Sequence, residues 1–60
     1  MEREEAKEWC EKGHKIKHIS FNDDEYIYYK NGKFLFENNE EVDSDWFGHM
    51  NYKWNWSLFY

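Results

Sequence analysis

The first thirteen residues carry the pattern of an amphipathic helix. Ala6, Trp9 and Cys10 recur at the i, i+3 and i+4 spacing of one helix face, and most of the other positions are charged. Glutamates in the first turn oppose the positive end of the helix dipole, and Gly13 suits the left-handed residue that ends a helix. We therefore expect an N-terminal helix with a narrow apolar stripe.

The residues after the helix predict a strand and then a hairpin. His14–Phe21 is predicted as a strand in which Ile16 faces opposite Ile19 and Phe21. Asn31-Gly32 lies between two aromatic runs, and this dipeptide favours a type I′ hairpin turn because both residues need positive φ. The turn sets the expected register: Lys30 with Lys33, Tyr29 with Phe34, Tyr28 with Leu35 and Ile27 with Phe36.

The two faces of the predicted hairpin differ in chemistry. One face carries no charge and should cover the helix; it consists of Ile27, Tyr29, Phe34 and Phe36. The other face is aromatic in the middle and basic at the tip; it consists of Tyr26, Tyr28, Lys30, Lys33, Leu35 and Glu37. Further along, Val42 is expected to add a short pairing, and Asp43-Ser44-Asp45 to cap one helical turn through Trp46 and Phe47.

The last nine residues alternate as a half-buried strand does. Their apolar face would hold Tyr52, Trp54, Trp56, Leu58 and Tyr60. One short helix is too small to cover both this face and the hairpin, so the remainder should meet a second copy, a partner or a ligand. We predict one small domain, residues 1–60, with an α+β fold: an N-terminal helix packed on a small antiparallel sheet of three to four strands, as a homodimer.

Composition narrows the class of protein. The chain has 60 residues, four Trp, five Tyr and five Phe, so a small core can be built from a few large side chains. Cys10 is the only cysteine, which excludes a disulfide within the chain and fits a reducing cytoplasm. The net charge of −5 argues against direct, sequence-independent nucleic-acid binding. Neither a signal peptide nor a membrane-spanning run is recognisable, so we expect no membrane contact.

The sequence does not predict catalysis or a cofactor. Cys10, His14 and His18 would line one stripe of an unbroken helix, but Gly13 interrupts it and no fourth ligand is evident, so we expect no metal. Motifs for a nucleophile, a phosphate-binding loop or paired carboxylates are lacking, so an enzyme is not expected. The clustered acidic residues leave open an acidic mimic of DNA, although a solvated surface has the same pattern.

Two sets of residues are candidate binding residues. Aromatic rings stack on nucleobases and lysines contact phosphates, which predicts a nucleotide-binding set: Lys15, Lys17, Tyr26, Tyr28, Lys30 and Lys33. Alternatively, these lysines keep a sheet edge soluble and the tyrosines pack at a dimer interface. Large aromatic residues dominate protein–protein affinity, which predicts a partner-binding set: Trp46, Phe47, Trp54 and Trp56.

The order of these features resembles a group of small bacteriophage proteins. In that group a helix of the type EAxxxLxxGKKIxH leads into a strand, and an aromatic residue, a hairpin and a C-terminal Trp follow. The matching positions are Glu5, Ala6, Gly13, Lys15, Ile16, His18, Phe21, Tyr26, Tyr28, Gly32, Trp54 and Trp56.

The best-understood members of this group are the Thoeris anti-defence proteins, oligomers that sequester a cyclic ADP-ribose-type signal between subunits. The resemblance implies a non-catalytic binder with the lysine and aromatic positions lining its pocket, although this chain is shorter and lacks the long middle insertion. The chain is similar in length to the Hachiman anti-defence proteins, which are small homodimers.

These observations predict a phage-encoded anti-defence protein in the host bacterial cytoplasm. It would inhibit a bacterial immune system by stoichiometric binding, with a nucleotide immune signal as the ligand. The alternative is a homodimeric inhibitor that binds and blocks a bacterial defence protein, either of the Hachiman type or as an acidic DNA mimic. A phage accessory protein without an immune target is a third hypothesis.

Overall fold

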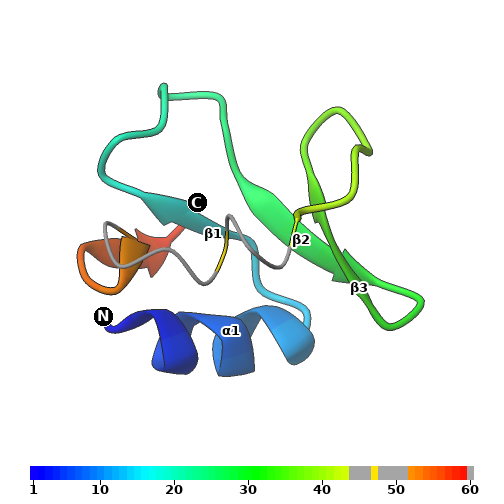
Figure 1. Ribbon diagram of the computed structural model, residues 1–60, viewed down its shortest axis with the longest axis horizontal. Coiled ribbons are helices and arrows are strands. Elements are labelled where there is room, and N and C mark those ends of the chain that lie inside the picture. Colours follow the sequence, from blue (N-terminus) through cyan, green and yellow to red (C-terminus); the bar gives the residue numbers. More distant parts are fainter. Residues whose placement is uncertain (44–46, 48–51, 60) are drawn as a thin grey trace.

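The structure is a computed structural model that describes residues 1–43, 47 and 52–59. Within these residues the structure has a helix, α1 (Arg3–Glu11), and the strands β1 (Ile16–His18), β2 (Ile27–Lys30), β3 (Lys33–Phe36) and β4 (Trp56–Leu58). The strands form one antiparallel sheet in the order β3-β2-β1-β4, and α1 packs on one face of it (Figure 1). The predicted α+β fold is confirmed, whereas the dimer stays a prediction.

Helix α1 ends in the way that its sequence predicts. Gly13 adopts φ +105°, its N–H donates to the Cys10 carbonyl at 3.0 Å, and the His14 N–H donates to the Trp9 carbonyl at 3.2 Å. These two hydrogen bonds form a Schellman motif, which satisfies backbone carbonyls at the end of the helix. The predicted apolar stripe is only partly correct, because Ala6 and Cys10 are buried but Trp9 is 36% exposed. The Trp9 ring instead packs edge-on against His14, with 5.1 Å between the centroids.

The hairpin forms with the predicted register. All four predicted pairs of β2 and β3 lie opposite each other, and the turn residues Asn31 and Gly32 have φ of 54° and 80°, as a type I′ turn requires. Ile27 is fully buried beneath α1, and Tyr29, Phe34 and Phe36 pack against the same core. The uncharged face of the hairpin therefore covers the helix, as predicted.

Strand β1 is shorter than the predicted strand, because the chain turns immediately after His18. The Ser20 N–H donates to Nδ1 of His18 at 3.1 Å, and the Phe21 N–H donates to the His18 carbonyl at 2.9 Å. This turn leaves Ile19 75% exposed and returns Phe21 to the core, where its ring contacts Trp56. The predicted placement of Ile19 and Phe21 on one strand face was therefore wrong.

The predicted nine-residue terminal strand is also shorter, since β4 spans only Trp56–Leu58. Asn55 adopts φ +71°, a left-handed conformation that breaks the alternation before the strand. As a result Trp56 is 2% exposed and Trp54 is 56% exposed, although the pattern placed them on one face. Tyr60 lies outside the described residues.

The core and the sheet edges are completed by segments outside the strands. Val42 and Phe47 join the buried cluster under α1, and the Val42 N–H donates to the Phe34 carbonyl at 2.9 Å, which confirms the short pairing expected there. At the opposite edge, Met1 and Trp56 exchange two backbone hydrogen bonds of 2.8 and 3.1 Å. Both outer strands are thus partly shielded from further pairing.

Two further predictions concern a helical turn at Phe47 and the lack of a membrane-spanning segment. The Phe47 N–H donates to the Asp43 carbonyl at 2.9 Å, as expected for the predicted helical turn, while Ser44, Asp45 and Trp46 lie outside those ranges. None of the described helical residues form a helix that is both long and apolar enough to span a membrane.

Candidate functional site

The face of the sheet opposite α1 gathers lysines and aromatic side chains. Ile16 lies opposite both Ile27 and Leu58, so β1 runs between β2 and β4, and its lysines lie between the side chains of the two neighbouring strands. Because side chains alternate along strands, the register places one set on this side, which we call the uncovered face: Lys15, Lys17, Tyr26, Tyr28, Lys30, Lys33, Leu35, Ser57 and Phe59.

Three rings in the middle of the uncovered face form an aromatic row, consisting of Phe59, Tyr26 and Tyr28. The Tyr26 centroid lies 4.9 Å from that of Phe59 and 6.2 Å from that of Tyr28. All three side chains are half-buried, and the Tyr28 hydroxyl donates to Oδ1 of Asn39. Neighbouring side chains therefore hold the rings while part of each stays accessible.

Two lysines lie directly against this aromatic row. Nζ of Lys15 is 4.6 Å from the centroid of Tyr26, and Nζ of Lys17 is 6.0 Å from that of Phe59. Both separations are within the range of a cation–π interaction. The structure thus brings together four of the six residues predicted to bind a nucleotide: Lys15, Lys17, Tyr26 and Tyr28.

The other two predicted lysines lie at the tip of the hairpin. Lys30 and Lys33 are paired and exposed, on the same face as the aromatic row. Lys30 is four positions after Tyr26, which amounts to about 13 Å along an extended strand. They can attract an anion to the face, but Lys15 and Lys17 are the lysines placed to contact a ligand on the rings.

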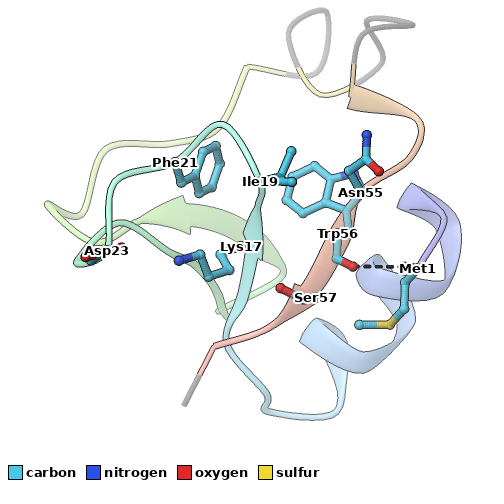
Figure 2. A pocket seen from close by; sticks show the side chains of 8 residues that line it. All are labelled: Met1, Lys17, Ile19, Phe21, Asp23, Asn55, Trp56 and Ser57. Carbon is cyan, nitrogen blue, oxygen red and sulfur yellow. Dashed lines mark hydrogen bonds between the residues drawn. The ribbon is translucent and has the colours of Figure 1, made fainter.

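An open pocket adjoins the uncovered face at the ends of β1 and β4. Its volume is about 480 Å³, within the ~300–1,000 Å³ typical of small-molecule sites. Figure 2 shows its lining residues: Met1, Lys17, Ile19, Phe21, Asp23, Asn55, Trp56 and Ser57. Lys17 alone among these was predicted to bind a ligand. It belongs to both the pocket and the cluster around the aromatic row.

Two local backbone features shape this pocket. The turn after His18 carries Ile19 and Phe21 to one side of it. The left-handed Asn55 precedes β4 on the other side, and its carbonyl accepts the Ile19 N–H at 3.0 Å. Neither feature has a signal in the pattern of apolar residues, which predicted continuous strands through both segments. An Asn that tolerates positive φ was the only available hint.

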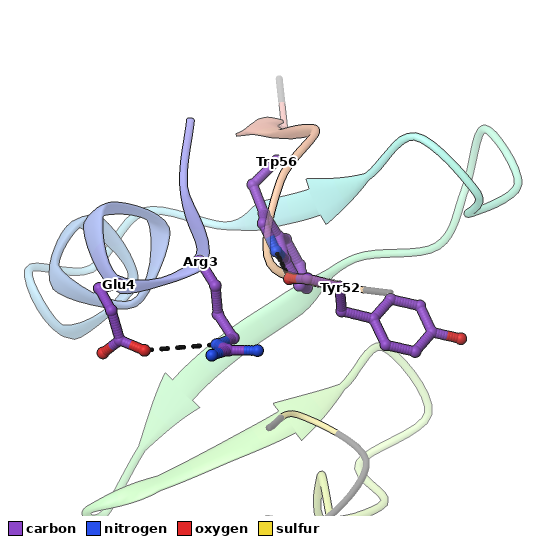
Figure 3. Close-up of polar contacts among 4 residues, drawn as sticks. All are labelled: Arg3, Glu4, Tyr52 and Trp56. Atoms are coloured by element: carbon purple, nitrogen blue, oxygen red, sulfur yellow. Dashed lines mark hydrogen bonds and ion pairs between the residues drawn. The ribbon is translucent and has the colours of Figure 1, made fainter. Parts of the chain in front are cut away.

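The helix carries the opposite charge to the uncovered face. Four exposed glutamates lie on α1 and one lies directly before it: Glu4, Glu5, Glu8 and Glu11, and Glu2. Nε of Arg3 lies 3.3 Å from Oε1 of Glu4, so one of these carboxylates is paired (Figure 3). Although the net charge is −5, the charges are separated: the uncovered face is basic and the helix surface is acidic.

The residues predicted to bind a protein partner have different environments. Phe47 and Trp56 are 5% and 2% exposed and belong to the core. In this conformation neither ring is accessible to another protein. Trp54 is 56% exposed, with Nζ of Lys53 at 5.6 Å from its ring, and so can contact a partner. Trp46 lies outside the described residues.

His18 and Ser20 form a hydrogen bond of the length found in nucleophile–base pairs, but its setting is structural. Nδ1 of His18 lies 2.8 Å from the Ser20 hydroxyl and also accepts the Ser20 N–H, which closes the turn after β1. Nε2 is buried and has no hydrogen-bond partner within the described part of the chain. The imidazole packs against the rings of Phe21, Tyr52 and Trp56. Among the described residues, no third group orients this imidazole as in a catalytic triad.

Cys10 is a buried thiol rather than a reactive one. It is 0% exposed, and its Sγ–H group donates to the Ile27 carbonyl at 3.7 Å. Burial, together with the nearby Glu11 carboxylate, raises the pKa of the thiol from 9.0 to about 12, because the thiolate would lose its hydration. Among the residues that the structure describes, no three His, Cys, Asp or Glu side chains are grouped to hold a metal ion.

The raised pKa of Cys10 predicts a loss of stability at alkaline pH. Above pH 9.0 the unfolded chain releases the thiol proton while the folded chain keeps it up to about pH 12. The free energy of unfolding should therefore fall between these two pH values, with a limiting slope of about 1.4 kcal/mol per pH unit for one proton. Urea denaturation of the wild type and of Cys10→Ala across this range measures the effect. Parallel pH profiles for the two proteins would contradict it, since Cys10→Ala should show the flatter profile.

Comparisons of this chain with protein-family models, with curated proteins and with solved structures found no match.

Proposed function

We propose that this protein binds a nucleotide on its uncovered face and acts by holding it, without turnover. The observation that carries this proposal is the cluster of two lysines against the aromatic row, with Nζ of Lys15 at 4.6 Å from the Tyr26 ring. Aromatic side chains stack on nucleobases with about 1–3 kcal/mol per base, and lysines bind phosphates as compact point charges. The face combines both kinds of contact within one group of neighbouring side chains.

The cluster also suggests how a nucleotide enters. Without a ligand, each ammonium group satisfies part of its charge on a ring. A base that stacks on Tyr26 would displace Lys15 from the ring, and the phosphate of the same ligand would then receive the displaced ammonium group. The lysine exchanges a weak cation–π contact for a charge-assisted hydrogen bond. Binding of base and phosphate would thus be coupled.

The sequence resemblance to Thoeris anti-defence proteins supports a role for such binding. We propose that a phage produces this protein in the bacterial cytoplasm to sequester a nucleotide immune signal, and that it does so as a dimer. Sequestration needs no catalytic group. The buried, protonated Cys10 and the structural His18–Ser20 contact are consistent with this.

A second function is favoured by a different surface. Trp54 and Ile19 are 56% and 75% exposed, and the Ile19 N–H donates to the carbonyl of Asn55, the residue next to Trp54. Two exposed apolar side chains at this end of the sheet could anchor a bacterial defence protein. The exposed glutamates of α1 would support the DNA-mimic form of this alternative.

Native mass spectrometry tests the proposed function directly. The purified protein is incubated with lysate from phage-infected, defence-carrying bacteria, recovered and measured without denaturation. An added mass of nucleotide size on a dimer is the expected result. A protein recovered without any small molecule would contradict nucleotide sequestration, and a bound host protein would favour the surface formed by Trp54 and Ile19. The same spectrum shows whether the protein is a dimer.

A further inference from the structure

The pocket and the aromatic row meet at one residue, Lys17. Its Nζ lies 6.0 Å from the Phe59 ring, and its side chain also lines the pocket of about 480 Å³ (Figure 2). We infer that the two regions form a single site for a ligand with two nucleobases joined through phosphate. One base would lie in the pocket, the second on the aromatic row, and the phosphate at the lysines between them. This inference rests on the proposed function and specifies its ligand.

The pocket has the lining that one base requires. Phe21, Ile19 and Trp56 supply apolar surface, while Asn55 and Asp23 supply polar groups. An asparagine amide can pair with both the amino group and the ring nitrogen of adenine, and a carboxylate accepts a hydrogen bond from an exocyclic amino group. The pocket therefore favours a base with an exocyclic amino group, such as adenine.

The aromatic row provides a second, separate place for a base. The ring centroids of Tyr26 and Phe59 lie 4.9 Å apart, and strand β1 runs between the two strands that these residues flank. The two rings are tilted by 39°, so a base would stack on one ring at a time, and stacking of this kind tolerates any base. The two base sites thus differ: the pocket selects by hydrogen bonding, and the aromatic row accepts by stacking.

The two lysines lie where the linking phosphate would be. Lys15 and Lys17 are two residues apart on the same side of β1, or about 7 Å. Ser57, opposite Lys17 in the β1–β4 ladder, adds a hydroxyl donor on the pocket side. A mononucleotide could use the lysines and only one base site. A dinucleotide would use both, and its second base would bind at a high effective concentration.

Isothermal titration calorimetry with three probes tests the inference: 5′-AMP, the linear dinucleotide pApA and cyclic di-AMP. We expect at least one dinucleotide to bind tenfold or more tightly than 5′-AMP. Preference for pApA would identify single-stranded nucleic acid as the source of the ligand, and preference for cyclic di-AMP would identify a soluble signal. Equal binding of all three would overturn the two-base site while leaving the proposed function intact. Binding of none would overturn both.

A matched pair of variants locates the second base. Asn55→Gly removes the pocket amide and keeps the left-handed backbone at φ +71°. It should reduce the affinity for the preferred dinucleotide at least tenfold, to the level at which the wild type binds 5′-AMP. Asn31→Gly makes the same substitution at a left-handed residue of the hairpin turn, φ 54°, and should alter neither affinity. Equal dinucleotide affinity in both variants would show that the pocket holds no base.

Discussion

Trp56→Ala should leave much of the protein unfolded at 25 °C. Trp56 is 2% exposed and packs against the rings of His18, Phe21 and Phe47, with centroid distances of 5.2, 5.8 and 5.6 Å. Its indole Nε1–H donates to the Tyr52 carbonyl, which lies beside it in Figure 3. Truncation would therefore open a cavity and leave a carbonyl without its donor.

The expected magnitude is comparable with the whole stability of the domain. Replacing a buried aromatic side chain by alanine costs about 3–5 kcal/mol. Proteins have roughly 0.05–0.15 kcal/mol of stability per residue, which for 60 residues is about 3–9 kcal/mol. A single substitution at the centre of so small a core can thus shift the equilibrium to the unfolded state.

Trp54→Ala is the matched control, because it removes the same side chain two residues earlier. Trp54 is 56% exposed, and exposed substitutions usually change stability by less than about 0.5 kcal/mol. Thermal unfolding should be monitored by circular dichroism, because each variant removes a tryptophan and so changes the fluorescence signal. Similar melting temperatures for the two variants would show that Trp56 does not hold the core together.

Reversing the charge of Lys15 and Lys17 should abolish nucleotide binding. In Lys15→Glu/Lys17→Glu, two carboxylates would replace the two ammonium groups beside the aromatic row. A hydrogen bond to a charged group contributes about 1.5–3 kcal/mol, and each 1.4 kcal/mol is tenfold in affinity. We expect the affinity for 5′-AMP or cyclic di-AMP, measured by calorimetry, to fall by at least about 100-fold.

Lys12→Glu/Lys53→Glu provides a control with the same change of net charge. Lys12 and Lys53 also lie over aromatic rings, at 5.3 Å from Trp9 and 5.6 Å from Trp54. Each double variant loses two cation–π contacts, at about 0.5–1 kcal/mol each, so their stabilities should be similar. Nucleotide binding should survive in the control alone. Equal losses of affinity would mean that overall charge, rather than the uncovered face, governs binding.

The hairpin shows how much of the fold is readable from local sequence. A type I′ turn requires positive φ at both central residues, which Asn31 and Gly32 tolerate. That turn determines which residues of the two strands pair. No distant residue is needed for this choice. The same holds for the end of α1, where Gly13 supplies positive φ within the Schellman motif.

The two shortened strands show where the pattern was insufficient. Alternation predicted strands through His18 and through Asn55, yet the chain turns after the first and becomes left-handed at the second. The turn depends on a histidine side chain that accepts a backbone N–H. The Asn55 carbonyl accepts the N–H of Ile19, which lies in the turn after β1. Periodicity of apolar residues carries no information about either hydrogen bond.

Sequence alone predicted the α+β fold, the hairpin register and the face on which the tyrosines and lysines of the hairpin lie. These follow from residue spacing and turn chemistry, which act over a few neighbouring residues. The tertiary structure alone decided that Trp56 is core and Trp54 surface, that Phe59 completes the aromatic row, and that Lys17 joins this row to a pocket. These outcomes depend on which segments meet across the sheet, because burial and pockets arise only when distant residues pack together.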